Sequence, residues 1–127
     1  MSRLADTQIL LWAAYAPEKL SAPARLALAT RTKPFFFSFA SIWEIAIKMS
    51  LQKLHLPEPL PVFVAGLQAY GFRFLPMQVA DAAVLLTLPR HHGDPFDRML
   101  IAQAQQRGFE LISSDGAFAS YGVKVVW

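Results

Sequence analysis

Short apolar runs alternate along the chain with longer segments in which apolar residues recur at helical spacing. The apolar runs predict strands that end at Leu4–Asp6 and span Phe35–Ser38, Phe72–Leu75, Phe109–Ser113 and Val123–Val126. The helical pattern predicts helices over Thr7–Tyr15, Ser21–Thr30, Ala40 or Ser41 to Ser50, Pro61–Tyr70, Val79–Leu88 and Asp94 to Gly108. Strands that alternate with helices predict an α/β fold, in which helices cover both faces of a parallel sheet.

The composition limits the possible classes of protein. The 127 residues suit one domain over residues 1–127, and the hydrophobic fraction of 54% favours a further apolar surface for a partner. No run reaches the length of a membrane span, and the most apolar stretch, Phe35–Ile47, contains Glu44. The absence of cysteine excludes disulfides and zinc sites built on thiolates. Because Asp6 interrupts the approach to the apolar run Ile9–Ala16, we expect no secretion signal and a cytoplasmic protein.

The net charge of +3 is small, but the acidic residues are unevenly distributed. Five of the nine acids belong to a candidate cluster, namely Asp6, Glu44, Asp94, Asp97 and Asp115. The rest of the chain then contains 12 basic residues and only four acidic ones. Such a surface favours a polyanionic partner, and nucleic acid is the first expectation.

Each acid of the cluster lies where a segment changes direction or within apolar sequence. Asp6 and Asp115 follow predicted strands, and Asp94 and Asp97 open a predicted helix. Sites in parallel α/β sheets form outside the carboxyl ends of the strands. Glu44 lies among Ile, Trp and Ala residues that leave little polar face on its helix. We therefore expect the carboxylates to meet in one pocket.

Simpler roles remain open for each of these acids. Asp6 and Asp94 suit helix N-caps, with Asp97 as the better ligand candidate of its pair. Glu44 has the spacing of a surface ion pair with Lys48, and the Asp115 segment resembles a generic turn. The neighbouring His91, His92, Arg90 and Arg98 suit a solvated loop better than a phosphate site.

Convergence of these acids would require a cation. Two carboxylates about 4 Å apart repel by about 4 kcal/mol at an effective dielectric constant near 20. Mg²⁺ or Mn²⁺ prefers oxygen ligands and retains waters, so either ion suits an all-carboxylate pocket. A bound dication activates water and holds a phosphate, which favours phosphodiester hydrolysis.

Four segments together resemble PIN-domain proteins, and most closely the VapC-type toxins of bacterial toxin–antitoxin pairs. They are Asp6-Thr7, Ser41–Lys48, His92–Ala104 and Ser113–Phe118. The resemblance implies an α/β/α sandwich with a central parallel sheet of four to five strands. It also implies a Mg²⁺- or Mn²⁺-dependent endoribonuclease that cleaves structured RNA such as tRNA or rRNA, forms a homodimer and is blocked by a cognate antitoxin.

The same resemblance assigns roles to particular residues. Asp6, Glu44, Asp97 and Asp115 take the catalytic and metal-binding positions. Asp94 is then a supporting acid, while Thr7 and Ser113 orient carboxylates or waters.

Two positions depart from the family pattern. Gln8 replaces a histidine that is common after Asp-Thr, and Gly116 replaces a frequent proline. Two other functions remain as alternatives. One is a catalytically silent, protein-binding module of the same fold. The other is an Asp-based phosphatase, which Gln8 disfavours because such enzymes carry Asp-x-Asp.

Overall fold

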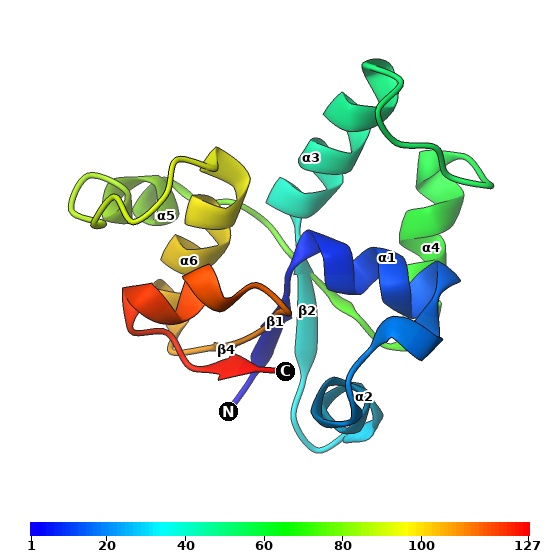
Figure 1. The fold of residues 1–127 in the computed structure, drawn as a ribbon, viewed down its shortest axis with the longest axis horizontal. Coiled ribbons are helices and arrows are strands. Elements are labelled where there is room, and N and C mark those ends of the chain that lie inside the picture. Colours follow the sequence, from blue (N-terminus) through cyan, green and yellow to red (C-terminus); the bar gives the residue numbers. More distant parts are fainter.

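The computed structural model describes residues 1–127 and contains one parallel sheet of five strands (Figure 1). The strands are β1 (Arg3–Ala5), β2 (Phe35–Ser38), β3 (Arg73–Leu75), β4 (Glu110–Ile112) and β5 (Val125–Val126). Their order in the sheet is β3-β2-β1-β4-β5. In the central register, Leu4 lies opposite Phe36 on one side and Leu111 on the other. The predicted α/β class and parallel sheet are confirmed.

The helices lie on both faces of this sheet (Figure 1). They are α1 (Thr7–Tyr15), α2 (Ala22–Ala29), α3 (Phe39–Ser50), α4 (Leu60–Tyr70), α5 (Val79–Val84) and α6 (Pro95–Arg107), with two 3-10 helices, η1 (Pro17–Lys19) and η2 (Gly116–Tyr121). None of them is long and apolar enough to cross a membrane.

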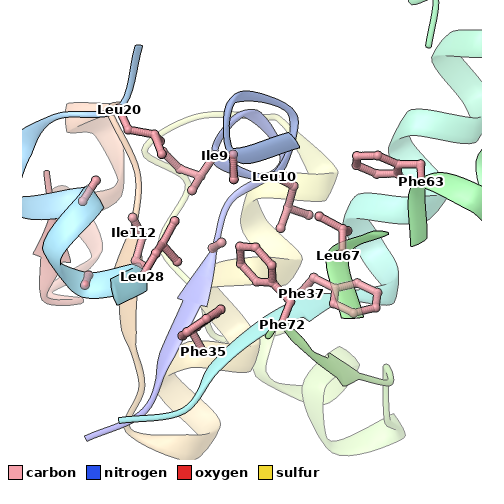
Figure 2. Close-up of a cluster of buried hydrophobic side chains, with 14 of the residues drawn as sticks. Ile9, Leu10, Leu20, Leu28, Phe35, Phe37, Phe63, Leu67, Phe72 and Ile112 are labelled. Carbon is pink, nitrogen blue, oxygen red and sulfur yellow. The ribbon is translucent and has the colours of Figure 1, made fainter. Parts of the chain in front are cut away.

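Alternation along the strands divides the core into two clusters. Ala5, Phe35 and Phe37 point to the face covered by α1, α2 and α4, where the cluster in Figure 2 forms. Leu4 and Leu111 point to the opposite face and pack against α6 and η2. A strand with a helix layer on each face must be apolar on both sides, which accounts for the nearly continuous apolar runs in the sequence.

Three predicted helix boundaries were wrong. The helix predicted from Pro61 begins one residue earlier, at Leu60. The third long helix begins at Phe39, because the hydroxyl of Ser38 accepts a hydrogen bond from the Ala40 N–H at 3.0 Å and caps it directly after β2. The helix predicted over Val79–Leu88 ends at Val84. Its last predicted residue, Leu88, precedes Pro89, and the proline ring disfavours helical geometry in the residue before it.

The order of the strands determines where a site can form. The chain passes from central β1 to β2 and β3 on one side, and later fills the other side with β4 and β5. The connections therefore diverge on either side of β1. A crevice forms at the carboxyl edge of such a sheet, where the strand order reverses.

Candidate active site

A cavity of about 360 Å³ lies beside the carboxyl ends of β1 and β4 and the start of α6. Five carboxylates from four separate segments line it. They are Asp6, Glu44, Asp94, Asp97 and Asp115. Thr7, Gln8, Lys48, Lys53 and Ser114 supply most of the other polar lining. All the acids of the sequence-derived cluster thus meet at one cavity.

Asp6 is both a helix cap and a member of this cavity. It directly follows β1 and is only 5% exposed. One carboxylate oxygen accepts a hydrogen bond from the Ile9 N–H at 2.9 Å, which caps α1, and the other accepts one from the Ser113 hydroxyl. Burial raises the pKa of Asp6 to about 6; the two hydrogen bonds oppose this rise, and the charges of Asp115 and Glu44 add to it.

Glu44 enters the cavity from α3 and is also 5% exposed. The hydroxyl of Thr7 donates a hydrogen bond to its Oε1 at 2.6 Å, and the ammonium of Lys48 lies 2.6 Å from its Oε2. Ser41 lies 2.9 Å from the Thr7 hydroxyl and completes a short polar chain. The predicted ion pair between Glu44 and Lys48 therefore forms, but the Glu44 carboxylate is buried in the cavity and does not lie on the surface.

Asp94 and Asp97 start α6 and differ in their roles. Asp94 is exposed and accepts hydrogen bonds from the Phe96 and Asp97 N–H groups at 2.9 and 3.0 Å, so it is the expected N-cap. Asp97 is half-buried in the first turn, and no protein group donates a hydrogen bond to its carboxylate. Burial raises the pKa of Asp97 to about 7, with further increases from the charges of Asp94 and Glu44.

Asp115 follows β4 and begins η2. Its side chain is exposed and accepts a hydrogen bond from the Ala117 N–H at 2.9 Å. The Asp115 N–H donates to the Ser113 hydroxyl at 3.0 Å, and this hydroxyl donates in turn to Asp6. Buried Ser113 therefore joins the ends of β1 and β4 and fixes one side of the cavity.

The carboxylate oxygens of the cavity are the kind of ligand that a hard dication prefers. All the candidate ligands are carboxylates, and burial raises the pKa of Asp6 and Asp97, with a further rise from the neighbouring carboxylates. No three histidine, aspartate or glutamate side chains are arranged to hold a metal ion. Because Glu44 is paired with Lys48, its carboxylate would have to change partners to coordinate a dication.

Two flanking residues that were predicted to lie on a solvated loop are packed inside. Arg98 is 7% exposed and donates hydrogen bonds to the carbonyls of Leu88 and Pro89 and to the Tyr121 hydroxyl. The ring of His92 packs edge-on against Phe118 and Tyr121. Both residues therefore hold the loop before α6 against η2.

Two lysines that line the cavity, Lys48 and Lys53, were not among the predicted site residues. Lys48 had a usable signal, because it lies four residues after Glu44 on the same helix face. Its hydrogen bond to Glu44 raises the pKa of Lys48, and Asp94 and Asp97 add to the rise. Lys53 lies beyond the end of α3 and carried no such signal.

Comparison with known proteins places this geometry in context. The model of the PIN domain family matches residues 3–124. VapBC2 from Rickettsia felis, solved bound to a DNA fragment from their promoter, matches with a TM-score of 0.74 and 11% identity, over 98% of this chain and 97% of that one. FitAcB from Neisseria gonorrhoeae matches with a TM-score of 0.65 and 18% identity, over 97% and 95%. FitAB bound to a DNA fragment matches with a TM-score of 0.66 and 17% identity, over 97% of this chain and 92% of that one. No curated protein sequence matches the chain.

Proposed function

The chain belongs to the PIN domain family, and from that premise we propose that it is a Mg²⁺- or Mn²⁺-dependent endoribonuclease. In this proposal it is the toxin of a toxin–antitoxin pair and acts in the cytoplasm as one domain over residues 1–127. The observation that carries the proposal is the convergence of carboxylates from four distant segments on one cavity. Asp97 neither caps its helix nor pairs with a cation, and burial and the neighbouring carboxylates raise its pKa to about 7, which favours a functional role for it.

The proposed metal ligands are the four acids Asp6, Glu44, Asp97 and Asp115. A bound dication would lower the pKa of a water molecule and balance charge on the scissile phosphate. Asp94 adds negative charge and begins α6 at the cavity. The hydroxyls of Thr7 and Ser113 each donate to one carboxylate, Glu44 and Asp6 respectively, and so orient them.

The charge distribution supports RNA as the substrate. The acids of the cavity are concentrated at one place, so basic residues outnumber acids on the remaining surface. Lys53 lines the cavity and is exposed, and we assign it to a backbone phosphate near the cleaved bond. Structured RNA such as tRNA or rRNA is the proposed target.

Protein partners are also part of the proposal. Another pocket, of about 190 Å³, is lined almost wholly by apolar side chains, among them Trp43, Met77 and Phe96. Trp43 is 49% exposed and Leu86 is 87% exposed, which is unusual for large apolar residues. We propose that this chain forms a homodimer and also binds a cognate antitoxin.

A catalytically silent binding module is the second candidate, because the same exposed apolar side chains would serve it. It predicts no gain in dication binding over a typical acidic surface. An Asp-based phosphatase would require a second acid two residues after Asp6, where Gln8 lines the cavity. We therefore do not develop the phosphatase further.

The proposal is tested by incubating the purified protein with a tRNA and rRNA mixture in Mn²⁺ or Mg²⁺, with and without EDTA. We expect cleavage that requires the metal. Asp6→Asn and Asp97→Asn should each lower the rate by at least about 100-fold, because each removes a ligand. Glu18→Gln is the matched control, since Glu18 is exposed and does not line the cavity. Cleavage by both Asp variants at the control rate would refute the nuclease assignment.

A further inference from the structure

The cavity contains a cation that belongs to the protein. Glu44 is the one carboxylate of the cavity that takes part in an ion pair, and its partner is Lys48. The Lys48 Nζ lies 2.6 Å from Oε2 of Glu44. The ammonium is also attracted by Asp94 and Asp97. The Lys48 ammonium thus balances part of the negative charge that several acids bring together.

The two partners of this ion pair differ in exposure and in the contacts that hold them. The Glu44 side chain is 7% exposed, whereas the Lys48 side chain is 48% exposed. Glu44 is held from the other side by the Thr7 hydroxyl at Oε1, while the Lys48 ammonium has Glu44 as its one hydrogen-bond acceptor. Lys48 is therefore able to leave the cavity by rotation of its flexible stem, and Glu44 is not.

We propose that Lys48 is the resident counter-ion of the acidic cavity, and that a dication must displace its ammonium from Glu44 in order to bind. This inference rests on the proposed function, because it concerns the same metal site. A dication and an ammonium cannot both occupy the Oε2 side of Glu44 without strong repulsion. Thr7 is a neutral donor and remains in place during the exchange. Lys48 consequently keeps the metal-free fold intact and limits the affinity for the metal.

A matched pair of variants separates direct exchange from a general effect of charge. Lys53 lines the same cavity, carries the same charge and makes no ion pair with Glu44. Lys48→Met and Lys53→Met therefore remove the same charge, but only the first removes a competitor for Glu44. Lys48→Gln serves as a second, polar variant, so that the result does not depend on the added methionine.

The experiment measures Mn²⁺ affinity by isothermal titration calorimetry and the melting temperature of the metal-free protein. We expect Lys48→Met and Lys48→Gln to bind Mn²⁺ roughly tenfold more tightly than wild type, and Lys53→Met less than about threefold more tightly. Without metal, both Lys48 variants should melt below wild type, because the cavity loses its counter-ion. With saturating Mn²⁺ that deficit should disappear.

The possible outcomes distinguish this inference from the proposed function. Equal Mn²⁺ affinity in wild type and both Lys48 variants would refute the exchange. An equal gain in Mn²⁺ affinity for Lys53→Met would also refute it. In either case, metal-dependent cleavage of RNA by the wild type would still support the nuclease assignment. Weaker Mn²⁺ binding by the Lys48 variants would refute it as well, since Lys48 would then assist the metal. Failure of wild type and of the Lys48 variants to bind Mn²⁺ would overturn both proposals.

Discussion

Replacing Asp97 by asparagine should stabilise the metal-free protein at pH 8, although it removes a proposed catalytic residue. Burial and the nearby carboxylates raise the pKa of Asp97 from 3.8 to about 7. At pH 8 the folded protein must therefore keep an unfavourable charge that the unfolded chain solvates freely. Asparagine has nearly the same shape without that charge, and it is also tolerated in a first helical turn.

The magnitude follows from the shift in pKa. A rise from 3.8 to about 7 corresponds to at most about 4 kcal/mol of free energy of unfolding. The introduced amide would still lose hydration, and the Asp97 side chain is only half-buried, so we expect a gain of about 1–2 kcal/mol. For a chain of this length, that raises the melting temperature by roughly 5 °C. At pH 5 the unfolded chain has already released this proton while folded Asp97 keeps it, so less than half of the gain should remain, and the gain should vanish only below about pH 4.

Thermal unfolding in EDTA at pH 5 and pH 8 measures this effect. Asp81→Asn is the matched control, because buried Asp81 pairs with Arg107 at 2.6 Å and its pKa is lowered. The same chemical change should destabilise the protein there at pH 8, by about 3 kcal/mol or more. Destabilisation by Asp97→Asn at pH 8, or a gain that is equal at both pH values, would show that the folded protein does not disfavour the charge of Asp97.

Three further results are expected. The metal-free wild type should lose stability as pH rises from about 4 to about 7, because folded Asp6 and Asp97 hold protons that the unfolded chain has released. A pH series of urea melts measures this, and a free energy of unfolding that increases over that range would contradict it. Arg98→Met should cost about 2–4 kcal/mol in the same melts, since three acceptors, two of them in buried hydrogen bonds, lose their donor. A cost below about 1 kcal/mol would be evidence against that role. Gly71→Ala should cost at least about 1 kcal/mol, because Gly71 has φ +126°, a conformation that alanine rarely adopts; a neutral result would exclude strain there.

The sequence was sufficient to predict the sheet and the segments that carry the acids. Phe35–Phe37 and Leu111-Ile112 are apolar at every position, as strands between two helix layers must be, and this pattern does not depend on distant residues. The local cap signals at Ser21 and Asp94 were also correct, because a cap involves residues only a few positions apart.

Tertiary contacts decided what the sequence did not reveal. The helix predicted up to Leu88 stops early, and the carbonyls of Leu88 and Pro89 accept hydrogen bonds from Arg98 on α6. No local pattern signals that a guanidinium ten residues away will be buried there. In the same way, the spacing of Glu44 and Lys48 predicts their contact but not its burial, which depends on α3 packing against α1 and α6.

The roles of the carboxylates remain predictions, and one measurement tests them most directly. Crystals grown with Mn²⁺ and measured for anomalous scattering locate the ion without any assumption about its ligands. We predict a peak within the cavity, bound by carboxylate oxygens of Asp6 and Asp97 together with Glu44 or Asp115, with Lys48 turned away from Glu44. Anomalous peaks only outside this cavity at saturating Mn²⁺, or none at all, would contradict the account.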